Sequence, residues 1–421
     1  MSKIIKYAGI LIAGIIFGLC SLFFVYALPV ERMQENALES LDPFMQEGEN
    51  PFLLEGYKGS SLDNFTDAIM LGNAVYEDEF SFWESAMEVP RAAGVDGAPM
   101  ESLEEYLEGE RDVERTEYSR YWHGYLLFLK PLLCFFNYEQ IRIINGCVQA
   151  VLLLWIACEF FKKRMFRGFV AFVLAVLGMF PVVFPRSLQF STVFYIGNIA
   201  LLLCLKNHER WKRRDLYPVF FFITGMCTSF FDFLTYPLYT FGMPIVLYLV
   251  FESEADGCKR FFSVIKYGIF WVTGYALMWV GKWIVGSLLT GENFYTKAFE
   301  TVAVRMSSEV YGETPSRIMA VLRNGYIYAN KAGVFLAVVL IIWIVSCIWR
   351  AHGEIKADRV LMMVFAACMP VVWYLLISNH SYAHYWYTFR ALSISIFALA
   401  MIPECINRRA PEEKSVTWNI K

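Results

Sequence analysis

Charged residues are scarce in this chain of 421 residues, where Asp, Glu, Lys and Arg together make up 18% of the sequence. A soluble globular protein carries roughly a quarter, because its whole surface faces water. The shortage therefore excludes an ordinary soluble protein. Hydrophobic residues reach 57%, and apolar runs of about twenty residues, the length needed to cross a bilayer, recur along the chain. We predict an all-α polytopic membrane protein.

The sequence also predicts neither a cysteine framework nor a cleavable signal peptide. The ten cysteines include no Cys-x-x-Cys pair, so neither a zinc site nor a set of disulfides is indicated. The first apolar run has no clear cleavage motif and is longer than the core of a signal peptide, which has about 7–15 residues. We therefore expect this run to remain as a transmembrane helix.

Hydropathy predicts about ten membrane spans. Their ranges lie near residues 6–28, 139–161, 168–185, 189–205, 216–234, 237–252, 263–285, 332–349, 359–377 and 388–406. The chain then divides into a first transmembrane helix (1–28), a large acidic loop (29–124), a bundle of the remaining spans joined by short loops (125–407) and a tail (408–421).

Charge is sorted between the loops. One set is basic, with FKKRMFRG (161–168) and KNHERWKRRD (206–215) as examples. Residues 29–117 instead hold 23 Asp and Glu and five Lys and Arg, a net charge of −18, which leaves +15 for the rest of a chain whose total is −3. Because loops rich in Lys and Arg stay in the cytoplasm, we expect both termini inside and the acidic loop outside.

The acidic loop has a helical hydrophobic period in VERMQENALESLDPFMQEG (30–48) and in FTDAIMLGNAVYEDEFSFWESAM (65–87). Amphipathic helices of this kind typically lie in the plane of the bilayer surface. We therefore predict an extracytoplasmic loop whose helices rest on or near the membrane.

Side chains suited to chemistry gather in loops expected on the same outer side. The stretch SSLDNFTD (60–67) places two carboxylates at i,i+4 spacing, and others come from EYSRYWHGY (117–125), FFDFLTYP (230–237) and SNHSYAHYWYTFR (378–390). The candidate site residues are Asp63, Asp67, Arg120, Tyr121, His123, Asp232, His380, His384 and Arg390.

Most of these residues also have a purely structural interpretation. Asp63 can cap a helix that begins at Asn64, and Tyr and Trp concentrate at membrane interfaces in general. His380 and His384 stand four apart, which suits a metal, but a metal site needs at least a third ligand. Asp232 is different, because a carboxylate among phenylalanines at membrane depth is costly and requires a partner or a role.

Together the outer side chains match the transfer of a sugar from a lipid-linked phosphate. A carboxylate can take the proton of an attacking hydroxyl. Arg and protonated His bind phosphate through charge-assisted hydrogen bonds. Aromatic faces such as that of Tyr121 offer flat platforms for sugar rings.

The layout resembles the GT-C superfamily of integral-membrane glycosyltransferases, in which a first span is followed by a large external loop with an acidic motif and then by many helices with short loops. The resemblance implies that Asp63 deprotonates the acceptor, which displaces the lipid phosphate with inversion. Glu31 and Glu35 lie nearer the first span and stay open as alternatives for the base. The resemblance also implies phosphate contacts from Arg120, His123, Arg390 or His384, and an acceptor or divalent-cation (Mg²⁺ or Mn²⁺) contact from Asp67 or Asp232.

The expected partners are a polyprenyl-phosphate sugar, a glycan or lipid acceptor and membrane lipids, without nucleic acid, because topology explains the short basic loops. The sequon NFT (64–66) would place a glycan against the proposed base, which favours a bacterial plasma membrane. Two other functions stay open. A transporter or flippase of lipid-linked glycans would use charges within the membrane, for which Lys282 and Glu159 are candidates. A polymerase or ligase of such glycans would have a similar outer face.

Overall fold

The computed structural model describes residues 2–407 apart from 78, 95–96, 110–112, 253–254, 308, 311 and 352–353. The predicted tail, 408–421, lies outside the described residues. The described chain is nearly all helical, as predicted. Its strands form two short antiparallel pairs, β1 (Pro90–Ala93) with β2 (Glu114–Glu117) and β3 (Glu354–Ile355) with β4 (Ile406–Asn407).

Within the described part of the chain, seven helical segments are long and apolar enough to cross a membrane. This confirms the polytopic membrane class. They are α1 (Ser2–Tyr26), α8 (Tyr138–Lys162), α10 (Leu188–Arg213), α13 (Gly257–Thr290), α16 (Lys331–Ala351), the pair α17 (Ala357–Ala367) and α18 (Met369–Leu376), and the run α20 (Tyr385–Thr388), η3 (Phe389–Leu392), α21 (Ser393–Ala400) and η4 (Ile402–Cys405).

Three shorter apolar helices lie at three of the predicted spans: α9 (Phe166–Gly178), α11 (Tyr217–Phe231) and α12 (Leu238–Phe251). At 1.5 Å per residue they are about 20–23 Å long, whereas the hydrocarbon core is about 30 Å thick. Seven spans therefore have the required length, and a total of ten stays a prediction.

The backbones of α11 and α13 approach each other closely. A Cβ atom added at Gly225 of α11 would lie 2.1 Å from the carbonyl oxygen of Trp271 in α13. One added at Gly274 of α13 would lie 2.1 Å from the carbonyl oxygen of Phe222. Small residues allow such backbone contact between membrane helices, so this glycine pair sets the distance between α11 and α13.

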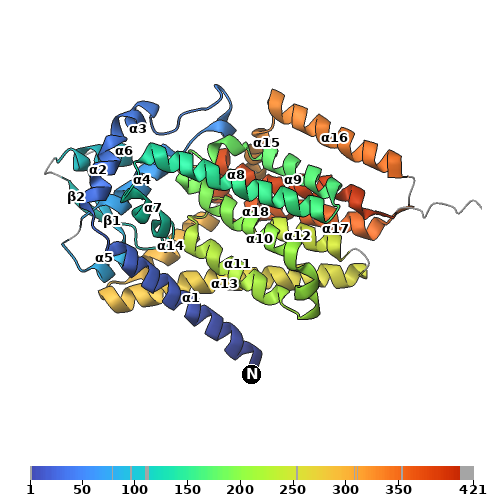
Figure 1. Cartoon of the computed structure of the whole chain (residues 1–421), viewed down its shortest axis with the longest axis horizontal. Helices are drawn as coiled ribbons and strands as arrows, with labels where there is room; N and C mark the ends of the chain where they lie inside the picture. Colours follow the sequence, from blue (N-terminus) through green and yellow to red (C-terminus); the bar gives the residue numbers. More distant parts are fainter. Residues whose placement is uncertain are drawn as a thin grey trace, which may run out of the picture.

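The predicted amphipathic segments of the first loop form a packed body at one end of the bundle (Figure 1). Their main helix, α4 (Asn64–Val75), has nine of its twelve residues buried, so it is a core helix and not a surface helix. The reason is that neighbouring elements cover it on several sides. The other elements of this body are α2 (Glu31–Glu39), α3 (Leu41–Glu47), η1 (Lys58–Ser60), α5 (Phe82–Glu88), α6 (Pro99–Leu107) and α7 (Leu126–Leu133).

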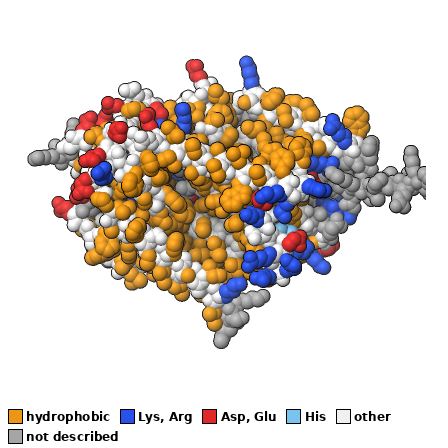
Figure 2. All heavy atoms as spheres, viewed as in Figure 1, with side chains coloured by type: hydrophobic (Ala, Val, Ile, Leu, Met, Phe, Trp, Pro, Cys, Tyr) orange, Lys and Arg blue, Asp and Glu red, His pale blue; other side chains and the backbone are white. Residues whose placement is uncertain are grey.

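Four further short elements complete the fold. They are η2 (Pro181–Val183), α14 (Phe294–Met306), α15 (Arg317–Tyr326) and α19 (Ser378–Ala383). Figure 2 shows most acidic side chains at the end that carries the first-loop body, most basic side chains at the opposite end, and an apolar surface between them. This distribution is the one expected if the long axis crosses the membrane.

Two buried lysines attach the first-loop body to the bundle. Lys282 of α13 donates to the carbonyl oxygen of Met87, at 2.7 Å, in the last turn of α5. Lys130 of α7 donates to the carbonyl oxygen of Ala74, also at 2.7 Å, in the last turn of α4. Each ammonium group therefore satisfies free carbonyl groups at the negative end of a helix.

Replacing Lys282 by Met should lower the thermal stability of the purified protein, because buried carbonyl groups of α5 would lose their donor. An unsatisfied buried polar group costs about 1–3 kcal/mol. Thermal unfolding in detergent measures the effect, with Lys266→Met, at a half-exposed lysine near Asp215, as the matched control. An equal melting temperature for Lys282→Met and the wild type would contradict the anchoring role.

Candidate functional site

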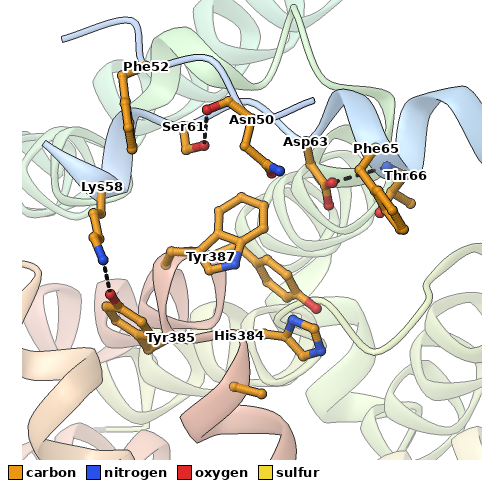
Figure 3. A pocket seen from close by; sticks show the side chains of 12 residues that line it. Asn50, Phe52, Lys58, Ser61, Asp63, Phe65, Thr66, His384, Tyr385 and Tyr387 are labelled. Carbon is orange, nitrogen blue, oxygen red and sulfur yellow. Dashed lines mark hydrogen bonds between the residues drawn. The ribbon is translucent and has the colours of Figure 1, made fainter. Parts of the chain in front are cut away.

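A cavity of about 420 Å³ lies between the first-loop body and the C-terminal helices (Figure 3). One wall comes from the segment that leads into α4, and the other from the junction of α19 and α20. Its lining residues are Asn50, Phe52, Lys58, Ser61, Asp63, Phe65, Thr66, Ala383, His384, Tyr385, Trp386 and Tyr387. Two of the nine predicted site residues, Asp63 and His384, therefore line the same cavity.

Asp63 is the N-cap of α4, as its sequence context allows, and its carboxylate accepts a hydrogen bond of 3.1 Å from the backbone N–H of Thr66. Only 3% of the residue is exposed. Burial, and then the nearby carboxylate of Asp67, raises the pKa of Asp63 to about 7. A carboxyl group with this pKa is suited to exchange protons near neutral pH.

Asp67 has a different environment and is fully buried. Its carboxylate accepts hydrogen bonds from the hydroxyl of Tyr138 at 2.5 Å and from the backbone N–H groups of Leu188 and Gln189 at 2.9 and 3.1 Å. Asp67 therefore caps the N-terminus of α10. These three donors already occupy the carboxylate, and the contact of Asp67 with an acceptor or a metal stays a prediction.

His384 faces the same cavity from the second wall (Figure 3). Its ring stacks on Tyr387, with 5.2 Å between ring centroids. Burial, and then the positive charge of Arg305, lowers the pKa of His384 to about 4. The imidazole is therefore neutral at pH 7, and it offers a polar edge beside an aromatic surface instead of a positive charge.

His380 lies behind His384, with 4.7 Å between the ring centroids. Arg305 of α14 donates to its Nδ1 at 2.7 Å, so Nε2 carries the proton and donates to the carbonyl oxygen of Leu234 at 2.6 Å. Burial lowers the pKa of His380 well below its usual value. Both ring nitrogens are occupied, so His380 positions Arg305 and the 234 turn and has no free nitrogen for a metal.

No three His, Cys, Asp or Glu side chains in the described ranges come together in an arrangement that could hold a metal ion. The carboxylate of Asp232, which was the strongest candidate in a membrane segment, accepts hydrogen bonds from the backbone N–H and hydroxyl of Thr235. It therefore stabilises the turn between α11 and α12, in which Leu234 has a φ of +68°. These hydrogen bonds satisfy the buried Asp232 carboxylate, so its presence does not require a bound substrate.

Arg120, Tyr121 and His123 do not line the cavity. The His123 Nε2–H donates to the carbonyl oxygen of Tyr118 at 2.7 Å, and burial lowers its pKa well below the usual value. The guanidinium group of Arg120 lies over the ring of Tyr118, at 4.7 Å from its centroid. Tyr121 stacks on Trp279 with 5.6 Å between centroids. The three residues therefore belong to an aromatic cluster and not to the wall of the cavity.

Arg390 is fully buried and forms hydrogen bonds to both walls of the cavity. Its Nη2 donates to the carbonyl oxygen of Gly59 at 3.1 Å, and its Nη1 donates to those of Trp386 and Tyr387 at 3.5 and 3.4 Å. Because Gly59 lies between the lining residues Lys58 and Ser61, Arg390 fixes the position of both walls. The Nε–H group of Arg390 is buried and forms no hydrogen bond within the described structure.

The sequence interpretation did not include Lys58 or Tyr385 among the candidate site residues. The Lys58 ammonium group donates to the Tyr385 hydroxyl at 2.7 Å across the cavity mouth, although the two residues are 327 positions apart (Figure 3). Lys58 is one of only five basic residues between 29 and 117, which is the one signal in the sequence that could have drawn attention to it. Glu31 and Glu35, the alternatives for the base, are exposed on α2 and do not line the cavity.

No family model matches the chain, and neither a curated protein nor a solved structure is similar to it at a significant level. The functional interpretation therefore depends on the geometry of this cavity.

Proposed function

We propose that the chain is a membrane glycosyltransferase that moves a sugar from a polyprenyl-phosphate donor to an extracytoplasmic glycan or lipid acceptor. Asp63 takes the proton of the acceptor hydroxyl, which attacks the anomeric carbon as the phosphate leaves on the opposite side, with inversion. The observation that carries this proposal is the buried Asp63 carboxyl group, with a pKa of about 7, facing the His384–Tyr387 segment across one cavity.

The rest of the cavity lining supports the same reaction. Aromatic side chains from both walls supply apolar faces for a sugar ring. Lys58 supplies a positive charge for the leaving phosphate at the mouth. Lys282, a candidate charge for a transporter, instead caps α5, and Glu159 forms an ion pair of 2.9 Å with Lys162. These two charges therefore give no support to the transporter alternative.

Transfer by the purified protein in nanodiscs tests the proposal. Polyprenyl-phosphate sugars with different sugars are offered with lipid and glycan acceptors, and the products are analysed by mass spectrometry and NMR. We expect a product whose anomeric configuration is opposite to that of the donor. Release of free sugar alone, or a product with retained configuration, would contradict an inverting transferase with Asp63 as base.

A further inference from the structure

A groove runs along one side of α16, and the cavity site begins at its outer end. Its first part, about 260 Å³, lies between α9 and the start of α16 and is lined mainly by apolar side chains, among them Leu177, Leu336 and Val339. Its second part, about 300 Å³, continues along α16 from Val339 past Trp343 to Arg350. Val339 lines both parts, so the two hollows adjoin on the same side of the helix.

The groove has the length and surface of a site for a hydrocarbon chain. Its lining residues on α16 run from Ala332 to Arg350, a distance of about 27 Å along the helix, close to the thickness of the hydrocarbon core, which is about 30 Å. Tyr328 and Trp343 turn their polar atoms into the protein: the Tyr328 hydroxyl donates to Gly178 at 2.7 Å and the Trp343 indole N–H donates to Ala400 at 3.1 Å. These two side chains therefore present only their aromatic carbon atoms to the groove.

Two cations stand where the groove meets the cavity. Tyr57 lines the groove and the next residue, Lys58, lines the cavity. Lys58 and Arg323 of α15 both lie against the Tyr385 ring, at 5.4 and 4.6 Å from its centroid. Their side-chain hydrogen bonds go to the Tyr385 hydroxyl and the Tyr382 carbonyl oxygen, and no described carboxylate forms an ion pair with either cation.

Two neighbouring cations that have no acidic partner among the described residues favour a bound anion. Lys and Arg are the usual ligands of phosphate groups. An anion there would be continuous with the apolar groove on one side and with the Asp63 cavity on the other. A single amphiphile with a phosphate head and a long linear chain matches both surfaces.

We propose that the groove along α16 binds the hydrocarbon chain of the lipid-linked sugar donor, with its phosphate held between Lys58 and Arg323. This inference rests on the proposed function and adds to it the path of the lipid. The sugar attached to the phosphate then extends into the cavity toward Asp63. The groove and the phosphate site belong to one ligand, so a polyprenyl phosphate without a sugar should also bind.

Photolabelling tests the groove without requiring transfer. The probe is a polyprenyl phosphate with a diazirine in its chain, offered to the full-length protein in nanodiscs and mapped by mass spectrometry. We expect labelling of α9 and α16 that falls at least tenfold in Leu336→Trp, which fills the groove. It should persist in Ile341→Trp, a matched change at a residue of α16 that is 60% exposed and lies outside the groove.

Two controls define the ligand. In the double variant Lys58→Ala/Arg323→Ala, labelling by the polyprenyl phosphate probe should fall. Labelling by a polyprenol probe, which has the same chain but no phosphate, should change little. Excess polyprenyl phosphate should compete and phosphatidylglycerol should not. Equal labelling of Leu336→Trp and Ile341→Trp would overturn the proposal that the groove binds the chain. If phosphatidylglycerol competed as well as polyprenyl phosphate, the groove would be a general phospholipid site. Retained labelling without any transfer would instead count against the proposed function alone.

Discussion

Replacing Asp63 by Asn should greatly slow sugar transfer while leaving the fold intact. General-base catalysis contributes about 10²–10⁴-fold to a rate, so we expect kcat to fall at least a hundredfold. Asn is also a good N-cap, and its side-chain oxygen can still accept from the N–H of Thr66. The measurement is the initial rate of transfer at saturating donor and acceptor, with the melting temperature as a check on folding.

The pH dependence of the transfer rate and of stability tests the same residue independently. A base with a pKa of about 7 works only when deprotonated, so the wild-type rate should rise as pH increases through 7. Stability should change in the opposite direction. The native pKa lies above the ordinary value of 3.8, so the folded state binds more protons and loses stability as pH rises from about 4 to about 7. Asp63→Asn should remove the part of this loss that Asp63 contributes. An unchanged kcat in Asp63→Asn would exclude Asp63 as the base.

Replacing Asp67 by Asn should instead damage the fold. The amide can accept at one oxygen only, so at least one of the three donors at Tyr138, Leu188 and Gln189 would lose its acceptor and face an N–H₂ group. Each buried group left unsatisfied costs about 1–3 kcal/mol. We expect a loss of about 2 kcal/mol or more in the free energy of unfolding, seen as a fall of several degrees in melting temperature.

Two variants make this prediction specific. Asp42→Asn removes an exposed carboxylate of the same loop body and should leave the melting temperature within error. Adding Tyr138→Phe to Asp67→Asn removes one orphaned donor, so the double variant should lose less stability than the two single losses added together. Additive losses would mean that the Asp67–Tyr138 hydrogen bond contributes little. A wild-type melting temperature in Asp67→Asn would contradict the capping role.

The spacing of Asp63 and Asp67 illustrates what sequence can and cannot predict. An i,i+4 pair is expected on one face of a helix, yet only Asp63 faces the cavity. Asp63 is the N-cap and precedes the helix, with non-helical backbone angles, whereas Asp67 lies in the first turn and meets the N-terminus of α10. The sequence predicted the capping position of Asp63, but the partner of Asp67 comes from a helix more than a hundred residues away.

Hydropathy predicted the class of the protein because burial in lipid demands long apolar helices. It could not predict which polar residues meet. Arg120 and His123 resembled phosphate ligands in the sequence, but aromatic neighbours and backbone carbonyl groups surround them. Lys58, Arg305 and Arg323 attracted no attention because isolated basic residues form no pattern in the sequence. Their importance comes from contacts with the 380–387 segment, and only the fold creates those contacts.

A cross-link across the cavity mouth is the most direct test of the proposed active site. Lys58 and Tyr385 are replaced by Cys in a chain whose ten native cysteines have been removed, and intact cells are treated with a short, membrane-impermeant bis-maleimide. We predict a cross-linked peptide pair from the double variant, formed without permeabilising the cells. A cross-link that forms only after permeabilisation would place the cavity on the cytoplasmic side. No cross-link, with both single variants accessible to a maleimide label, would separate the two walls of the proposed active site.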